Sequence, residues 1–188
     1  NGGDGFVIAS ELRARAHDVF CVLPGFKEPT AEDARAAFVR WTAAGGQVHH
    51  KIPADARVAG VVDALFGIGT ARPLSGPHLD AVAWMNQQQA VYAIDVPSGL
   101  DADTGTWVGD VPGVRATATI TFIGDKPGLH TAEVGLHHAY PARAVLVFLT
   151  LAVPMELDLY PAVLVRVDLV AGRPHNDRGL WPLHESLV

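Results

Sequence analysis

Two charged residues, Asp95 and Lys126, each stand just beyond an apolar segment of the chain. Asp95 ends the run AVYAID, and Lys126 follows the run ATATITFI. A carboxyl group partly shielded from water is suited to taking up and releasing protons near neutral pH. The lysine either pairs with Asp95, meets a phosphate or remains solvated. We therefore interpret Asp95 as a candidate acid–base group, with Lys126 as its possible partner.

A third charged residue, Asp63, lies inside the apolar run VAGVVDALF. An unpaired carboxylate would be costly there, so Asp63 needs a cation, a backbone donor or an arginine as its partner. The glycine-rich loop 67–76 follows and carries Arg72, whose guanidinium can hold a phosphate through two parallel hydrogen bonds. The alternative is that Asp63 caps a local turn and that Arg72 is simply exposed.

Glycines also open the sequence, in the segment Asn1-Gly2-Gly3-Asp4-Gly5 just ahead of a stretch with helical periodicity. Glycines let the backbone come close to a ligand, and the N–H groups at a helix N-terminus attract anions such as phosphate. The alternative is an ordinary turn in which Asp4 offsets the helix dipole.

Other polar residues are interpreted as structural. Asp101 and Asp103 stand in a glycine-flanked turn and are expected to form it, with a divalent-metal pair as the alternative. Cys21 lies within an apolar run and has no charged neighbour to activate it, which indicates an inert core thiol. The pairs His49-His50 and His137-His138 lack the spacing of a helical metal site, so we expect packing or surface roles.

The elements that position these residues are predicted from their periodicity. Short apolar runs bounded by Pro, Gly or polar residues predict strands within 18–23, 47–52, 58–66, 90–96, 116–123 and 144–151, the second of them near a sheet edge. Helical periodicity appears between several of them. Strands that alternate with helices predict an α/β fold with a parallel, doubly wound sheet. The loops after successive strands then gather at one edge, where ligands bind.

Helix ends are predicted from capping signals. The first helix is expected over Phe6–Ala16. Thr30 and Asp33 resemble a capping box for the second helix. Ser75 is expected to cap the third helix, with Pro77 in its first turn.

The composition restricts the classes of protein that remain. The 188 residues are enough for one domain with a sizeable core, and 49% of them are hydrophobic, which argues against disorder. A net charge of −6 argues against a broad nucleic-acid surface, and one cysteine excludes an internal disulfide. The longest apolar run falls short of the about 20 residues that span a bilayer. We expect a cytoplasmic protein without nucleic-acid or membrane partners.

Taken together, the glycine-rich loops and the charged residues resemble the YjeF N-terminal domain family, the NAD(P)H-hydrate epimerases. The resemblance extends over about residues 1–130 and rests on five blocks in the family's order and spacing: NGGDGFV (1–7), DALFGIG (63–69), RPLSG (72–76), DVPSGLDADTG (95–105), and TF followed by KPGL (121–122 and 126–129).

The resemblance implies a Rossmann-like, three-layer α/β/α fold with a mostly parallel sheet. It also implies that the R and S hydrates of NADH or NADPH (NADHX and NADPHX) are interconverted at C6 of the dihydronicotinamide ring. A potassium ion would be held by Asn1, Asp63 and Ser98. Catalysis is assigned to Asp95 and Lys126. Substrate contacts would fall on Asn1, Gly2, Gly3, Asp4, Gly67, Ile68, Gly69, Thr70, Ala71, Arg72, Pro73, His78 and Asp95.

Epimerisation at C6 requires either loss and return of the hydroxyl group or opening of the ring. Both routes move a proton on and off oxygen, and Asp95 is the candidate for that transfer. Lys126 would either set the charge of Asp95 or share the proton. A non-catalytic binding or protein-interaction module of the same fold is the competing hypothesis.

Domain organisation is expected from the same resemblance. The family's first strand and leading helices are not in the sequence. We therefore expect a truncated epimerase domain over 1–170, with a sheet that lacks a central strand. Residues 171–188 resemble a linker toward a dehydratase domain in the same full-length chain. The family resemblance also suggests a homodimer.

Overall fold

A seven-stranded sheet forms the centre of the part of the chain that the structure, a computed structural model, describes: residues 2–25, 28–69, 72–130, 145–148 and 163–167. In spatial order the strands are β2 (Gln47–His49), β1 (Phe20–Val22), β7 (Val163–Val167), β3 (Gly60–Ala64), β4 (Val91–Ile94), β5 (Ala118–Phe122) and β6 (Val145–Phe148). All neighbouring pairs are parallel except those of β7, which runs antiparallel to β1 and β3.

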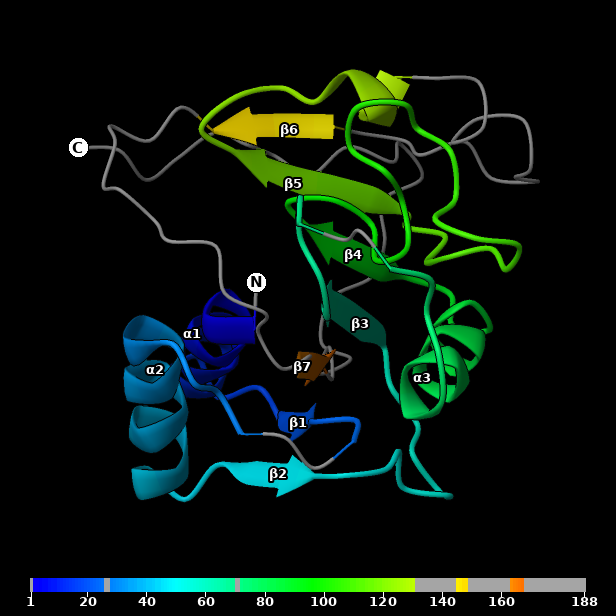
Figure 1. Cartoon of the computed structure of the whole chain (residues 1–188). Coiled ribbons are helices and arrows are strands. Elements are labelled where there is room, and N and C mark those ends of the chain that lie inside the picture. Colours follow the sequence, from blue (N-terminus) through cyan, green and yellow to red (C-terminus); the bar gives the residue numbers. More distant parts are fainter. Residues whose placement is uncertain (1, 26–27, 70–71, 131–144, 149–162, 168–188) are drawn as a thin grey trace, which may run out of the picture.

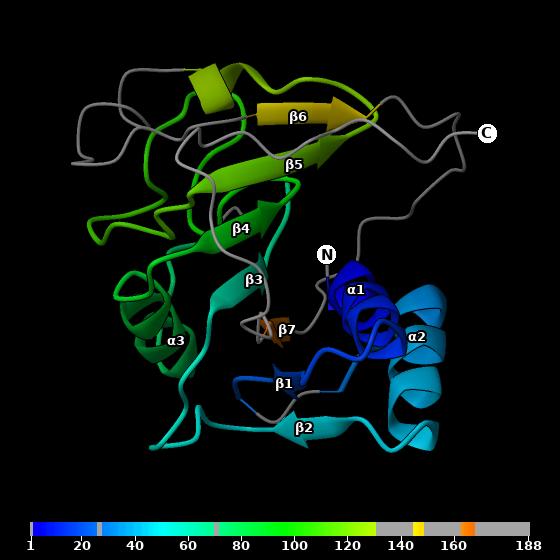
Figure 2. The same cartoon turned by 180° about the vertical axis from the view of Figure 1, so that it is seen from behind.

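Helices cover both faces of this sheet (Figures 1 and 2). Helices α1 (Gly2–Ala14) and α2 (Glu32–Ala43) pack together on one face, and α3 (Pro77–Met85) lies on the other. Successive residues of a strand therefore enter different cores: Val62 joins the cluster under Phe6 and Trp41, while Val61 joins the cluster under Met85. The result is the three-layer, Rossmann-like α/β/α fold expected from the sequence. Among the described residues, no helix has both the length and the apolar character needed to cross a membrane.

The predicted strands are confirmed, with ends closer together than the apolar runs suggested. β2 lies at the edge of the sheet, as expected. For the run 144–151, the confirmation covers the four residues of β6, and the others lie outside the described residues.

Three predicted helix starts are wrong. Helix α1 begins at Gly2 and not at Phe6, because Gly3 allows a close approach to α2: a Cβ on Gly3 would lie 3.1 Å from Ala34 Cα. The capping box of α2 does not form, since Ala31 is the N-cap residue and no side chain caps the helix. Gly76, with φ of 53°, takes the N-cap position of α3 in place of Ser75, although Pro77 is in the first turn as predicted.

The sequence did not predict β7. Five residue pairs join it to β3 and two join it to β1, so it satisfies backbone groups that would otherwise be unpaired between those strands. The expectation of a sheet without a strand at this central place is therefore wrong. The predicted linker 171–188 lies outside the described residues, and the boundaries of the domain remain a prediction.

Candidate active site

Polar side chains from three neighbouring strands and from the loops that follow them meet where β3, β4 and β5 end. They form two sets. The first set is Asp95, Thr121 and Lys126, and the second is Asp63 with Ser98. The loops that follow β3 and β4 are joined by hydrogen bonds from Phe66 N–H to Ser98 Oγ (3.0 Å) and from Ile68 N–H to Asp95 Oδ2 (3.3 Å).

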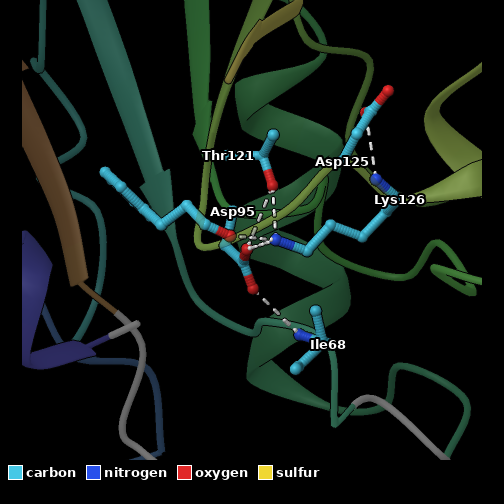
Figure 3. Close-up of polar contacts among 6 residues, drawn as sticks. Ile68, Asp95, Thr121, Asp125 and Lys126 are labelled. Atoms are coloured by element: carbon cyan, nitrogen blue, oxygen red, sulfur yellow. Dashed lines mark hydrogen bonds and ion pairs between the residues drawn. The ribbon is translucent and has the colours of Figure 1, made fainter. Parts of the chain in front are cut away.

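Asp95 and Lys126 form a largely buried ion pair (Figure 3). Lys126 Nζ lies 2.7 Å from Asp95 Oδ1, and both side chains are 14% exposed. Thr121 Oγ1 donates to the same carboxylate oxygen at 3.3 Å. Of the alternatives left open for Lys126, pairing with Asp95 is confirmed and a solvated side chain is wrong.

A sharp backbone turn presents Asp95 at the end of β4. Its φ is 68°, and the N–H of Val96 donates to the carbonyl of Ile94 at 2.9 Å, which closes a γ-turn around Asp95. β5 ends in the same way, around Ile123, whose φ is also 68°. Such a backbone is strained, most of all for a β-branched residue, by roughly 1–3 kcal/mol each. Strain of this kind concentrates at sites where side-chain position matters.

The loop that carries Lys126 is anchored at Gly128, in the 3-10 helix Pro127–His130. Gly128 N–H donates to the carbonyl of Ala102 at 2.8 Å. A Cβ on Gly128 would lie 2.5 Å from Asp101 O and 2.7 Å from Ala102 O, and both are backbone atoms that cannot rotate away. The absence of a side chain at Gly128 therefore lets this loop dock on the turn 101–105.

We expect Gly128→Ala to lower the free energy of unfolding by about 1–3 kcal/mol, because the added methyl group has to displace backbone. Gly124→Ala is the matched control on the same loop, since a Cβ there meets nothing within 4 Å. The control should change stability by no more than about 0.5 kcal/mol. Urea unfolding of both variants checks this, and equal effects at the two glycines would contradict the docking role of Gly128.

Asp63 is fully buried and is held by three donors. Ser98 N–H donates to Oδ2 at 2.8 Å, Ser98 Oγ donates to Oδ1 at 2.7 Å, and Leu65 N–H reaches Oδ1 at 3.2 Å. Backbone and hydroxyl donors thus supply the partners that the sequence predicted for Asp63. The hydrogen bond from Leu65 N–H also agrees with the alternative that Asp63 caps a local turn. Burial raises the pKa of Asp63 to about 6, because the hydrogen bonds from Ser98 offset only part of the cost of losing water.

The first turn of α1 supplies a further acidic group near this edge. Burial, reinforced by the negative charge of Asp95, raises the pKa of Asp4. Gly2 and Gly3 belong to the same turn, so their N–H groups are among those that a helix leaves without internal partners. Gly3 itself fits closely against α2, which gives it a packing role in addition to any contact with a ligand.

The remaining predicted substrate contacts are more scattered. Ile68 lies beside Asp95, and its neighbours Gly67 and Gly69 form the same loop. Arg72 and Pro73 are exposed, and His78 is half-buried against Phe66, with ring centroids 5.1 Å apart. Burial lowers the pKa of His78. Within the described part of the chain, Asp95 forms no hydrogen bond with Arg72, Pro73 or His78. The predicted contacts Asn1, Thr70 and Ala71 lie outside the described residues.

Two structural interpretations are confirmed. Asp101 Oδ1 accepts hydrogen bonds from Asp103 N–H (3.1 Å) and from Thr104 N–H and Oγ1 (both 2.8 Å), so it forms the turn. These bonds, chiefly those from Thr104, lower the pKa of Asp101. Cys21 is a core thiol whose pKa is raised by burial.

Sequence reasoning missed Thr121 as a member of the site. Its side chain is fully buried, and its hydroxyl contacts both Asp95 and Lys126. The available signal was its position as the last of the buried alternate residues of β5, where Thr119 and Thr121 alternate with less buried neighbours. The pair Asp125–His130, joined at 2.7 Å on the exposed side of the lysine loop, was also missed.

A doubly wound α/β/α sheet defines a Rossmann-like domain, and this one carries a largely buried ion pair at its strand ends. Residues 1–128 match the family described as "YjeF-related protein N-terminus", and the chain belongs to this family.

Several named proteins are similar to the chain. "NAD(P)H-hydrate epimerase" of Bordetella pertussis is 48% identical over 110 residues, which are 58% of this chain and 48% of that protein. The protein of the same name from Rhodobacter capsulatus is 44% identical over 104 residues, 55% and 49% of the two chains. "Bifunctional NAD(P)H-hydrate repair enzyme Nnr" of Gloeobacter violaceus is 39% identical over 113 residues, 58% of this chain and 22% of that protein. The matched segment thus spans about half the length of these epimerases.

Proposed function

We propose that the protein is an isomerase that interconverts the R and S hydrates of NADH or NADPH at C6 of the dihydronicotinamide ring. The observation that carries the proposal is the ion pair of Asp95 and Lys126 at the strand ends, in a domain whose relatives are named as NAD(P)H-hydrate epimerases. Such a pair suits a reaction that requires one proton to move on and off oxygen.

Asp95 has the geometry of the proton carrier. Its Oδ1 accepts from Lys126 and Thr121, while Oδ2 accepts one long bond from the described residues, from Ile68 N–H at 3.3 Å. Oδ2 therefore keeps a lone pair for the substrate. If the C6–O bond breaks, Asp95 must first carry a proton on Oδ2, taken from solvent. It gives this proton to the departing hydroxyl group, which leaves as water, and takes one back from the water that adds to the opposite face. If the ring opens, it takes the hydroxyl proton and returns it after closure.

Substrate binding is assigned to the elements around this oxygen. The first turn of α1, with Gly2, Gly3 and Asp4, is proposed to meet the dinucleotide, because a helix N-terminus favours phosphate. The loop with Gly67, Ile68 and Gly69 contacts Asp95 through the N–H of Ile68. Further proposed contacts, on the strength of the family resemblance, are Asn1, Thr70, Ala71, Arg72, Pro73 and His78.

A potassium ion is proposed beside Asp63 and Ser98. The donors fit a hard cation, since a carboxylate and a hydroxyl oxygen lie 2.7 Å apart and Asp63 is fully buried. The raised pKa of Asp63 supports the proposal, because a cation would add to the stabilisation that the hydrogen bonds give the buried carboxylate. Asn1 is the third ligand implied by the resemblance. Such an ion would supply positive charge at the end of β3, next to the loop 66–69.

The direct test incubates the full-length protein with the purified R hydrate, with and without potassium, and follows formation of the S form by chromatography. We expect conversion to the equilibrium mixture, faster with potassium than with an equal concentration of tetramethylammonium. No conversion in either salt would overturn the proposal and favour the non-catalytic binding module.

The epimerised product is proposed to pass to a dehydratase that consumes the S form. The name of the Gloeobacter violaceus relative, a bifunctional repair enzyme, supports a dehydratase in the same full-length chain. A homodimer and a cytoplasmic location remain predictions from the sequence.

A further inference from the structure

The ammonium group of Lys126 is surrounded by three acceptors, one for each of its protons. Nζ lies 2.7 Å from Asp95 Oδ1, 2.6 Å from Thr121 Oγ1 and 2.7 Å from the carbonyl oxygen of Phe122. All three are short, charge-assisted hydrogen bonds. In this environment the nitrogen has no lone pair directed at a substrate, so Lys126 has no position from which to take a proton.

The hydroxyl of Thr121 joins the two charged residues. It accepts from Lys126 Nζ and donates to Asp95 Oδ1 at 3.3 Å, and these two roles use its one proton and one of its lone pairs. Oδ1 of Asp95 then has two donors, from Lys126 and Thr121. The other oxygen, Oδ2, is left with the long bond from Ile68 N–H.

We propose that Thr121 is a positioning residue for the epimerisation: it fixes the ammonium group of Lys126 against Asp95 Oδ1 and leaves Asp95 Oδ2 as the atom that exchanges the proton. This inference rests on the proposed function for its catalytic consequence. It decides between the two roles that the sequence left open for Lys126, because a lysine held by three acceptors sets charge and does not share the proton.

The place of Thr121 in the sheet explains how it can hold this geometry. Thr121 is fully buried on β5, and the strand continues into the γ-turn at Ile123 that brings Lys126 back over it. A β-branched side chain has few allowed χ1 rotamers on a strand, so the hydroxyl is directed with little loss of conformational freedom. Serine would keep the hydroxyl but not the methyl group that restricts its rotation.

The experiment compares Thr121→Val, Thr121→Ser and Thr119→Val in the full-length protein. Thr119 is the matched control, because it is buried, lies two residues earlier on the same strand and faces the same side. Within the described residues it bonds neither Asp95 nor Lys126. Thermal unfolding of each variant establishes that it is folded.

The first readout needs no substrate. Proton exchange of the Lys126 ammonium group, followed by ¹H–¹⁵N NMR, should be about tenfold faster or more in Thr121→Val than in wild type, since one acceptor is lost. Thr121→Ser and Thr119→Val should stay near the wild-type rate. Unchanged exchange in Thr121→Val would overturn the proposal even if the protein proved to have a different activity.

The second readout is steady-state kinetics with the R hydrate. Thr121→Val should lower kcat by about 10- to 100-fold with KM changed by no more than about twofold, because proton transfer and not binding is affected. Thr121→Ser should recover most of that loss. Equal losses in Thr121→Val and Thr119→Val would show a purely structural role and contradict the proposal. A wild-type protein without epimerase activity would instead refute the proposed function, while the NMR readout would still test the role of Thr121.

Discussion

Replacing Asp95 by asparagine is expected to slow epimerisation of the hydrate by about 10²- to 10⁴-fold, the range for loss of a general acid–base group. The amide keeps the size of the side chain, and its oxygen can still accept from Lys126 and Thr121 at the Oδ1 position. It then places an NH₂ group at the Oδ2 position, where no proton can be taken up or released. The loss should therefore appear in kcat, with KM changed only a few-fold.

Asp103→Asn is the control for this experiment, because Asp103 is an exposed residue of the turn 101–105 and contributes its backbone N–H to that turn. It removes one negative charge and leaves the ion pair intact, so the wild-type rate is expected. Initial rates of S-hydrate formation with the full-length protein give both results. Wild-type kcat in Asp95→Asn would remove Asp95 from the mechanism.

The meeting of Asp95 and Lys126 was predictable from the sequence because it follows from strand direction. Each residue comes shortly after an apolar run, and runs that alternate with helices form parallel strands whose ends lie at one edge. The pairing of β4 with β5 fixes where Asp95 lies along β5, since Asp95 N–H donates to the carbonyl of Ile120 at 2.7 Å. Asp63 was also predicted, but by a different argument: a carboxylate in an apolar strand is costly and therefore needs a partner.

The γ-turns that aim these side chains were not predictable. A positive φ is normally marked by glycine or asparagine, whereas here it occurs at Asp95 and Ile123. Both turns follow directly from strands that pair with each other, β4 and β5, so their conformation depends on contacts that no local sequence pattern specifies. Thr121 was missed for a related reason: a threonine in a strand is common, and its role depends on a lysine that folds back from the next loop.

β7 shows the limit of local patterns most clearly. The run VLVRV at 163–167 is short and mostly apolar, but its partners are Cys21 and Val22 of β1 and the residues of β3, which lie far away in the sequence. Nothing within the run specifies an antiparallel insertion between β1 and β3. The start of α1 was missed on a smaller scale: the helix begins at Gly2 and packs closely against Ala34 at Gly3, although glycines otherwise predict a loop.

The second large effect is expected at Asp63, in the dependence of stability on pH. The pKa of its carboxyl is raised by burial from 3.8 to about 6 in the folded protein. As the pH rises from about 4 to 6, the unfolded chain releases this proton while the folded chain keeps it, so the free energy of unfolding falls. A shift of this size corresponds to a loss on the order of 2–3 kcal/mol, complete above pH 6.

Asp63→Asn should remove this dependence, since the amide does not titrate. Urea unfolding of the full chain between pH 4.5 and 6.5, in potassium-free buffer, measures the difference between wild type and variant at each pH. The matched control is Asp101→Asn: the pKa of Asp101 is lowered, so that residue titrates below this range and the variant should keep the wild-type slope. If the free energy of unfolding of wild type and of Asp63→Asn varied with pH in parallel, the raised pKa assigned to Asp63 would be wrong.

Potassium provides the final step of the same experiment. An ion bound beside Asp63 and Ser98 would stabilise the carboxylate, so added potassium should raise the stability of the wild type most above pH 6, where the buried charge is present. The Asp63→Asn variant should respond little, because its side chain carries no charge to compensate. If potassium raises the free energy of unfolding of wild type and variant equally, the ion acts elsewhere and does not compensate the buried charge of Asp63.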